Sequence, residues 1–318
     1  MSLYRFYVEG CSNASDKIYI SGKDYNHIRN VLRLRIVEEI IVSDGTSKDF
    51  HCRIAAYHDS TDSGSEHSDD HVSGKKTGRD NKNFDDFVGM VETEIIDFNE
   101  NATELPVRVI LFQGMPKADK FEHIIQKTVE LGVTEIYPVM MKRCVVKLEG
   151  GTGSVDKDGF IKVSSKEAKK LERYNKISEA AAKQSQRGII PEVKGYISYK
   201  QAIDMAAQMD MMLVPYESAE GMDHSREIIS EIKKLADKYM AENSSVSSMN
   251  DGADNMADNN AEMPSVAVFI GPEGGFAPEE IEYAEEKGGK VLSLGNRILR
   301  TETAGPAIMA ILGFALDR

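Results

Sequence analysis

The N-terminal third of the chain alternates short apolar runs with turn residues, a pattern typical of a small β-rich domain. The apolar runs cover residues 5–8, 17–20, 39–42 and 87–96. A helical stretch at residues 24–34 interrupts them, and Asp44-Gly45-Thr46 predicts a hairpin turn. We therefore predict a small β-barrel domain over residues 1–103.

From Leu105 onward the pattern changes to an alternation of strands and helices. The predicted strands cover residues 107–112, 135–139, 211–214, 266–270 and 291–294, with a further strand near Val193. The predicted helices cover residues 119–131, 166–187, 199–207, 226–240 and 304–316. This alternation predicts an α/β domain over residues 104–318, with a mostly parallel sheet covered on both faces. A length of 318 residues agrees with two domains.

Composition narrows the class of protein. The chain is 41% hydrophobic, enough for sizeable cores, but it has no run of about 18 apolar residues that would span a membrane. The N-terminal MSLYRFYVEG lacks the charged and apolar regions of a secretory signal. Three widely spaced cysteines argue for reduced thiols and against a disulfide framework or a zinc site. We expect a cytoplasmic protein without metal.

The formal net charge of −13 argues at first against an RNA partner. The acidity is local, however, because residues 59–105 carry a net −9 and residues 240–264 a net −5. The rest of the chain is close to neutral, at +1, so the sequence is compatible with a basic face for phosphate contacts.

Two glycine-bearing loops near the C-terminus follow apolar strands and lead into helices. The first reads FIGPEGGF over residues 269–276, and the second reads LSLGNRILRTETA over residues 292–304. Loops at the carboxyl ends of parallel strands form a crevice for small ligands, and glycines let backbone N–H and C=O groups reach the ligand. Neither loop is a nucleotide fingerprint, because GPEGG lacks a following Lys-Ser/Thr and no G-x-G-x-x-G opens a helix.

A tight turn and a helix start explain GPEGGF on its own, since Pro278 suits the first helical position. The second loop changes this interpretation. Arg297, Arg300 and Glu302 stand in an otherwise apolar segment, and core packing does not require them. The two loops together predict a ligand site.

These motifs resemble the RsmE family of bacterial 16S rRNA (uracil-N3)-methyltransferases, which belongs to the SPOUT superfamily. The resemblance rests on GPEGGF followed by LG-x-R-I-L-R-T-E-T-A and extends over residues 4–304. The other matching segments are Arg5-Phe6, HI-x-x-VLR at 27–33, KADK at 117–120, QK at 126–127, ELGV at 130–133, EAA-x-x-QS-x-R at 179–187 and Pro191. Polar segments at about 58–86, 149–163 and 240–264 depart from the family's compact length and are predicted to be insertions. Gly305-Pro306 also departs from it, and a proline in the first helical turn is tolerated.

The resemblance implies an N-terminal PUA-like RNA-binding β-barrel and a C-terminal trefoil-knot methyltransferase domain. It implies S-adenosylmethionine as the methyl donor and N3 of uridine 1498 of 16S rRNA, within the small ribosomal subunit, as the acceptor. The predicted cofactor-binding residues are Leu213, Val214, Pro215, Ile270, Gly271, Pro272, Glu273, Gly274, Gly275, Leu292, Leu294, Gly295, Leu299, Arg300, Thr301 and Thr303.

The acceptor nitrogen is protonated and a poor nucleophile at neutral pH, so catalysis needs a group that polarises or takes its proton. Glu302 is the candidate, and stabilisation of a helix N-terminus is its simpler role. Arg300 and Arg5 are candidates for holding the uridine or a uracil anion, although an exposed position on a first strand would also explain Arg5. The candidate RNA-binding residues, each of which an ordinary solvated position would also explain, are Arg29, Arg33, Lys117, Lys120 and Arg187.

Two alternative functions stay open at this point. The chain resembles SPOUT enzymes generally, so tRNA ribose 2′-O-methylation is one other activity, and a non-catalytic ribosome-assembly protein is another. His58, His67 and His71 are interpreted as solvated loop residues rather than metal ligands. The nearly all-round apolar helix at 304–316 predicts a homodimer, although burial within one chain would also explain it.

Overall fold

A computed structural model describes residues 3–8, 10–11, 16–45, 48–59, 89–100, 103–148, 155–157, 159–217, 219, 221–247 and 262–317. The chain divides into two compact units, Met1–Ala102 and Thr103–Arg318. Most of the predicted insertions at 58–86 and 240–264 lies outside the described residues, as do His67 and His71. None of the described helices is long and apolar enough to cross a bilayer.

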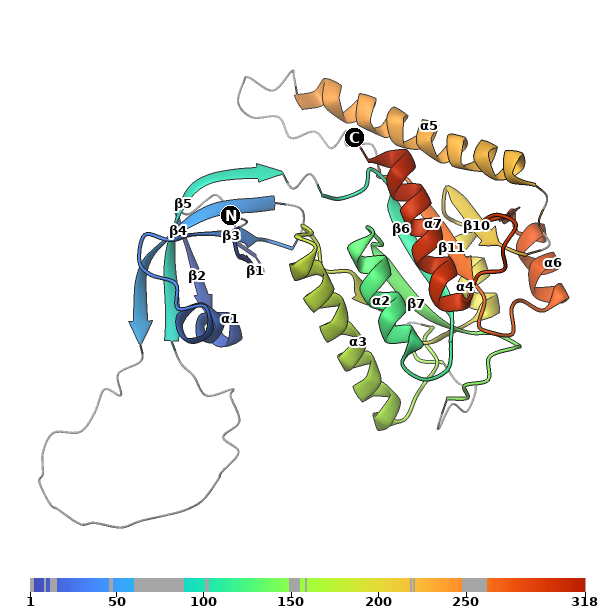
Figure 1. The fold of residues 1–318 in the computed structure, drawn as a ribbon, viewed down its shortest axis with the longest axis horizontal. Helices are drawn as coiled ribbons and strands as arrows, with labels where there is room; N and C mark the ends of the chain where they lie inside the picture. Colours follow the sequence, from blue (N-terminus) through green and yellow to red (C-terminus); the bar gives the residue numbers. More distant parts are fainter. Residues whose placement is uncertain are drawn as a thin grey trace, which may run out of the picture. The chain divides into compact units, whose positions relative to one another are not determined.

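The first unit is one curled mixed sheet of five strands in the order β1-β3-β4-β5-β2 (Figure 1). Its elements are β1 Arg5–Tyr7, β2 Lys17–Ser21, α1 Gly22–Asn26, η1 His27–Val31, β3 Glu39–Ser43, β4 Lys48–Asp59 and β5 Gly89–Glu100. The sheet is a half-barrel, because among the described residues no pairing joins β1 to β2. Strand β4 was not predicted, and the predicted helix at 24–34 is two short helices. The antiparallel pairing of β3 with β4 places a hairpin at Asp44-Gly45.

The second unit is a seven-stranded sheet in the order β12-β10-β11-β6-β7-β8, with β9 beside β7. All pairings between its strands are parallel, as the strand–helix alternation predicted. Its strands are β6 Arg108–Gly114, β7 Glu135–Met140, β8 Glu192–Val193, β9 Ile197–Ser198, β10 Met211–Pro215, β11 Ser265–Ile270 and β12 Lys290–Leu292. Its helices are α2 Lys120–Glu130, α3 Ser165–Gln184, α4 Tyr199–Ala206, α5 Met222–Ser247, α6 Pro278–Glu286 and α7 Thr301–Leu316.

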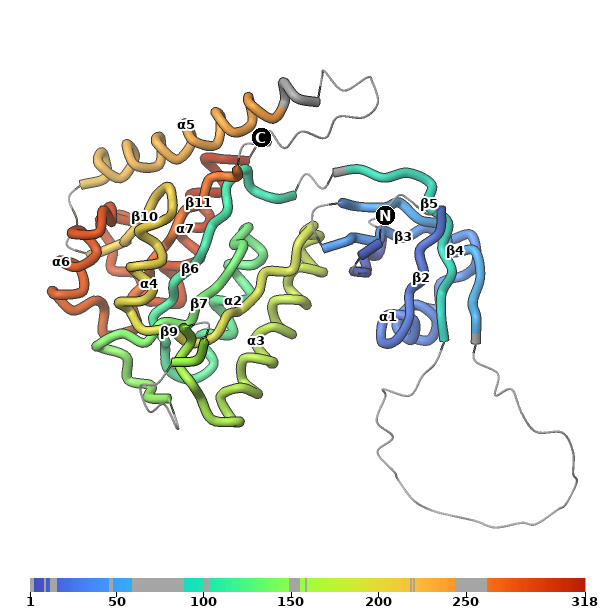
Figure 2. Tube along the Cα trace, turned by 180° about the vertical axis from the view of Figure 1, so that it is seen from behind, coloured from blue at the N-terminus to red at the C-terminus, as the bar shows by residue number. Residues whose placement is uncertain are grey.

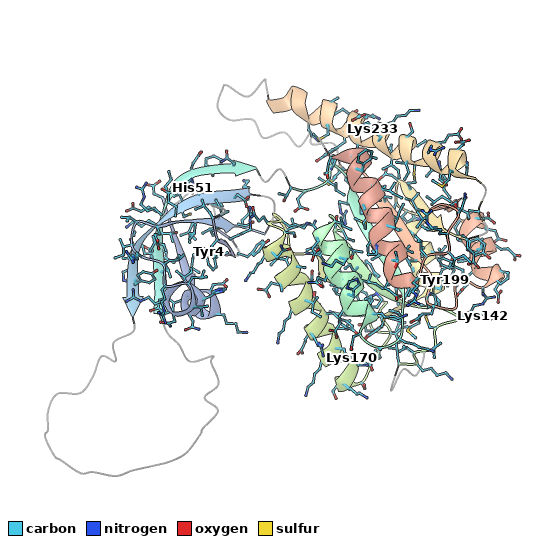
Figure 3. All side chains as sticks on the ribbon, viewed as in Figure 1. Tyr4, His51, Lys142, Lys170, Tyr199 and Lys233 are labelled. Carbon is cyan, nitrogen blue, oxygen red and sulfur yellow. The ribbon has the colours of Figure 1, made fainter. Side chains whose placement is uncertain are left out.

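Alternate residues of the strands face two separate cores. On one face of the sheet, Val109 and Leu111 belong to a core with α2, α3, α5 and α7. On the other face, Ile110 and Phe112 belong to a core with α4 and α6. Figures 1 and 2 view the sheet from opposite sides, with α7 and α2 in front in the first and α4 in front in the second. Tyr199, labelled in Figure 3, joins α4 to α6, because its hydroxyl donates to the C=O of Glu280 at 2.7 Å.

The structure departs from the sequence prediction in three places. Helix α5 continues to Ser247, so the first residues of the predicted 240–264 insertion are helical. The 149–163 segment is partly packed, because the side-chain amide of Gln201 donates to the C=O of Gly159 at 2.8 Å. Pro306 lies beyond the first turn of α7, which begins at Thr301. Its missing N–H therefore leaves the C=O of Glu302 without the usual helical donor.

Candidate active site and cofactor cavity

Three neighbouring strands end side by side at one edge of the parallel sheet. Strand β10 pairs with β11 on one side and β12 on the other, and the three end at Pro215, Ile270 and Leu292. The loops that follow them therefore meet at the carboxyl edge, where such sheets bind ligands.

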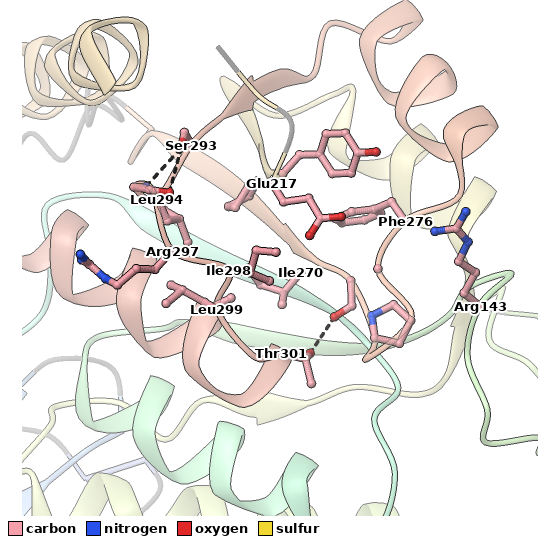
Figure 4. Close-up of a pocket in the computed structure, with 17 residues that line it drawn as sticks. Arg143, Glu217, Ile270, Phe276, Ser293, Leu294, Arg297, Ile298, Leu299 and Thr301 are labelled. Carbon is pink, nitrogen blue, oxygen red and sulfur yellow. Dashed lines mark hydrogen bonds between the residues drawn. The ribbon is translucent and has the colours of Figure 1, made fainter. Parts of the chain in front are cut away.

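A cavity opens between these loops and the start of α7 (Figure 4). The predicted cofactor residues that line it are Pro215, Ile270, Gly271, Pro272, Gly275, Leu294, Gly295, Leu299 and Thr301. The structure thus brings together residues from all three loops, which are separated by up to some ninety positions in the sequence.

The other predicted cofactor residues lie elsewhere. Leu213, Val214 and Leu292 are buried within their strands and belong to the cores. The side chains of Arg300 and Thr303 are exposed, and Glu273 contacts Lys117 and Lys120.

Gly274 is not among the residues that line the cavity. A Cβ at Gly274 would meet the Cβ of Arg143, itself a lining residue, at 2.9 Å, so the contact of Gly274 with the cofactor stays a prediction. Gly275 lines the cavity. Its φ is 66°, and a Cβ there would meet no atom within 4 Å. Gly295 behaves in the same way, with a φ of 114°.

Several lining residues were not predicted as ligand contacts. These are Arg143, Tyr216, Glu217, Phe276, Ile298 and Ala304, whereas Ser293 and Arg297, which also line the cavity, belong to the second loop of the predicted ligand site. Most of them lie shortly after the ends of β10, β11 or β12. The rule that ligands bind at the carboxyl ends of parallel strands could therefore have predicted them. Arg143 is the exception, because it follows β7, which pairs with none of the three strands. Its guanidinium donates to the C=O of Gly274 at 3.1 Å.

A buried hydrogen-bond chain ties the start of α7 to the GPEGG loop. The side-chain amide of Gln113 donates to the Thr301 hydroxyl at 2.9 Å, and that hydroxyl donates to the C=O of Gly271 at 2.6 Å. The second contact is drawn in Figure 4. The chain holds α7 against the cavity, because breaking it would leave buried polar groups unpaired.

A cluster of charged side chains lies at the N-terminus of α7. Lys120 Nζ lies 3.2 Å from Oε1 of Glu273 and 3.2 Å from Oε2 of Glu302. The contact with Glu302 is an ion pair without good hydrogen-bond geometry. Oε2 of Glu302 is therefore buried and ion-paired with Lys120, but it accepts no well-aligned hydrogen bond from the described residues. A buried acceptor in this state fits a donor supplied by a ligand.

The surroundings keep both carboxylates ionised. The hydrogen bond from its own backbone N–H lowers the pKa of Glu302, burial opposes this, and Lys120 lowers the pKa further. Burial would raise the pKa of Glu273, but the backbone N–H of Lys117 and the Lys120 ammonium lower it overall. The pKa of Lys120 is raised, mainly by its contact with Glu273 and to a smaller extent by that with Glu302, so Lys120 stays a cation.

The two candidate arginines lie in different units. Arg300 caps α7 with an 84% exposed side chain, and its Nη1 is 4.0 Å from Oε1 of Glu302. Arg5 is largely buried in the first unit, where its guanidinium binds both carboxylate oxygens of Asp49, one of them at 2.7 Å. That pairing already neutralises Arg5, so a direct role for it in holding uracil is not supported.

The candidate RNA-binding residues differ in their exposure and in their bonding partners. Arg29, Arg33 and Lys117 are exposed, and the Arg29 guanidinium lies 4.2 Å from the centre of the Tyr57 ring. Lys120 is held by two carboxylates, as described above. Arg187 is only 2% exposed. It is bound by Glu104 and by the C=O of Val129 at 3.1 Å, so the prediction that it contacts RNA was wrong.

Comparison with known proteins decides the family. A family model described as an RNA methyltransferase domain matches residues 103–228 and 221–313, and one described as an RNA methyltransferase PUA domain matches residues 20–57. Ribosomal RNA small subunit methyltransferase E of Bacillus subtilis is 30% identical over 90% of this chain and 85% of its own length. The chain belongs to the ribosomal RNA small subunit methyltransferase E family. The family and the methyltransferase activity predicted from the motifs are thereby confirmed.

Solved structures agree with this family in fold. A putative methyltransferase from Legionella pneumophila, in complex with bound S-adenosylmethionine, is 25% identical with a TM-score of 0.61, covering 99% of this chain and 98% of that one. The family's methyltransferase E from Neisseria gonorrhoeae, bound to S-adenosylmethionine, has a TM-score of 0.64 at 24% identity, covering 98% of both chains. In the part of this chain that the structure describes, no three His, Cys, Asp or Glu side chains gather as a metal site requires.

Proposed function

We propose that this protein transfers the methyl group of S-adenosylmethionine to N3 of a uridine in 16S rRNA, by resemblance uridine 1498, within the small ribosomal subunit. The family membership supports the small-subunit rRNA substrate. The observation that carries the choice of N3 is the buried Oε2 of Glu302, which is ion-paired with Lys120 but accepts no well-aligned hydrogen bond from the described residues, because uracil N3 presents an N–H donor.

The cavity fits the cofactor by the chemistry of its walls. Leu294, Leu299 and Ile298 offer apolar surface for an adenine ring, and Gly275 and Gly295 expose backbone beside it. The charged lining residues are the cations Arg143 and Arg297 and the anion Glu217, and charges of both signs suit the carboxylate and ammonium of a methionine moiety. When bound, S-adenosylmethionine supplies a methyl group on a sulfonium, from which a neutral thioether leaves. The trefoil knot implied by the resemblance is part of this proposal.

Glu302 acts on the acceptor. Its lowered pKa keeps it ionised, so Oε2 accepts a hydrogen bond from N3–H and orients the nitrogen toward the methyl group. As the N–C bond forms, the N3 proton passes to Oε2. A carboxylate with a low pKa is a weak base, so proton transfer accompanies methyl transfer rather than preceding it. Arg300, exposed beside Glu302, supplies positive charge that stabilises the developing uracil anion.

Mass spectrometry of rRNA nucleosides tests the proposal. Small subunits from a strain that lacks this activity are incubated with the protein and S-adenosylmethionine, and 3-methyluridine is expected in the digested 16S rRNA. A 2′-O-methyl nucleoside, or methylation of tRNA but not of small subunits, would replace the proposal with the alternative SPOUT activity. Absence of any methylated product together with absence of cofactor heat in calorimetry would indicate a non-catalytic protein.

We also propose that the protein is a homodimer in which α7 forms the interface. Ala310, Ile311 and Phe314 are exposed on one face of α7, and Phe314 is 93% exposed. An aromatic side chain this exposed, beside other apolar residues on one helix face, marks an interaction surface. The same helix in a second copy presents an identical face, as a two-fold interface requires.

Phe314→Glu is therefore expected to convert a dimer into a monomer, because it buries a carboxylate in the proposed interface. Sedimentation equilibrium measures the mass, and circular dichroism checks the fold. Met205→Glu is the matched control, because Met205 is an exposed apolar residue on α4, away from α7. A wild-type monomer, or an unchanged mass in the Phe314 variant, would contradict the α7 interface.

A further inference from the structure

The segment between η1 and β3 holds two non-glycine residues in the left-handed backbone region. Arg33 has a φ of 54° and Val37 a φ of 72°. This conformation is unfavourable for a residue with a Cβ, and most of all for a β-branched one. A backbone outlier of this kind persists only where the surroundings impose it.

Arg33 directly follows Leu32, the residue that caps the end of η1. The N–H of Leu34 donates to the C=O of Ile28 at 3.1 Å, and that of Leu32 to the C=O of His27 at 2.9 Å. When an N–H beyond the end of a helix donates to a C=O of its last turn in this way, the residue in the left-handed conformation is usually glycine. The backbone at this position therefore favours glycine, yet the chain carries an arginine.

Val37 occupies the third position of a four-residue turn. The N–H of Glu38 donates to the C=O of Arg35 at 3.1 Å and closes the turn. Turns with a positive φ at the third position normally use glycine there. Two hydrogen bonds to Ile54 of β4, each 2.9 Å long, hold the conformation: the N–H of Val37 donates to the Ile54 C=O, and the Ile54 N–H donates to the Glu38 C=O.

Core packing does not explain these side chains. Val37 is 69% exposed, and its neighbours Val31 and Ile36 are exposed as well. The cations Arg29, Arg33 and Arg35 are exposed on the same segment. The acid at the turn is Glu38, whose carboxylate accepts a hydrogen bond from the backbone N–H of Arg35. The segment 31–37 therefore presents apolar side chains next to several guanidinium groups, on a backbone held rigid by β4.

We propose that segment 31–37 is an RNA-binding wedge, in which Arg33 binds a phosphate and Val37, with Ile36, packs against an unstacked base. This inference rests on the proposed rRNA substrate and adds the residues that grip it. Guanidinium groups favour a polyanion over an uncharged protein surface, and apolar side chains contact bases where RNA is unpaired. The segment also lies inside residues 20–57, which match the RNA methyltransferase PUA domain.

Substitution by glycine removes the side chain at each position without straining the backbone, because glycine suits a positive φ. A loss of binding without a loss of stability then indicates a ligand contact rather than a structural role. The probe is the unmethylated small ribosomal subunit, bound in filter assays over a range of KCl concentrations. For Val37→Gly we expect an unchanged or higher melting temperature and binding weaker by about tenfold, with the same salt dependence. For Arg33→Gly we expect a melting temperature that is likewise not lowered, weaker binding, and a slope of log K against log salt reduced by about one.

Two further variants complete the test. Gln186→Gly is the matched control, because Gln186 is an exposed non-glycine residue with a φ of 59° in the second unit, and its binding should equal that of wild type. Val37→Thr keeps the branched shape but adds a hydroxyl, and it should also weaken binding. Equal binding by wild type and both glycine variants would overturn the wedge, and so would a loss in Val37→Gly that Val37→Thr does not share. If wild type itself neither binds nor methylates small subunits, the proposed function fails instead.

Discussion

Replacing Glu302 with glutamine is expected to lower kcat by roughly two to four orders of magnitude, the usual contribution of a positioned proton acceptor. Glutamine has nearly the same shape but cannot take the N3 proton. The affinity for S-adenosylmethionine should stay within about twofold, because Glu302 does not line the cavity. Single-turnover methylation of small subunits measures the first quantity, and calorimetry measures the second.

Glu273→Gln is the matched control, since Glu273 contacts the same Lys120 Nζ at the same distance of 3.2 Å. It should retain most of the activity, because Oε1 of its carboxylate is bound by the Lys117 N–H and by Lys120, and neither of its oxygens is buried without a hydrogen bond as Oε2 of Glu302 is. Equal losses in both variants would mean that the cluster is structural and that Glu302 does not accept the proton.

The pH dependence follows from the same cluster. The pKa of Glu302 is lowered, so its carboxylate form is present at neutral pH and activity is lost as pH falls through that lowered pKa. Lys120→Met removes a cation that lowers the pKa, so the acid limb of the kcat profile should move to higher pH. A structural role for Lys120 would reduce the rate without moving that limb.

Gly275→Val is expected to abolish measurable binding of S-adenosylmethionine. Gly275 lines the cavity, and a side chain there would enter open space that the cofactor is proposed to occupy. The substitution also strains the backbone at a φ of 66°, which costs on the order of 1–3 kcal/mol of stability. Calorimetry reports binding, and thermal melting followed by circular dichroism reports stability.

The strain is controlled by Gly288→Val. Gly288 also has a positive φ, 87°, and an open Cβ direction, but it follows α6 and does not line the cavity. Both variants should lose similar stability, while only the Gly275 variant loses the cofactor. Normal binding by a folded Gly275→Val protein would show that the cofactor lies elsewhere.

Sequence periodicity alone determined the second unit well. Buried parallel strands are continuous apolar runs and their covering helices are amphipathic, so residues 107–112, 211–214 and 266–270 stood out as strands. The strand-end rule then placed the GPEGG and LGNRILRTETA loops at one edge of the sheet. Strand β4 was harder to predict, because the polar residues Lys48, Asp49 and His51 mask the alternation of buried Phe50, Cys52 and Ile54.

Only the tertiary structure decided which side of each loop faces the cavity. Gly274 and Gly275 are adjacent, yet one packs on Arg143 and the other lines the site, because neighbouring residues of a turn point in different directions. Likewise, the charge of Arg187 says nothing of its burial against Glu104, and nothing in the order of residues pairs Lys120 with Glu302. Local sequence sets backbone periodicity, whereas contacts between distant segments set side-chain environment. The residues that carry the chemistry are therefore recognised as a site only after the chain has folded.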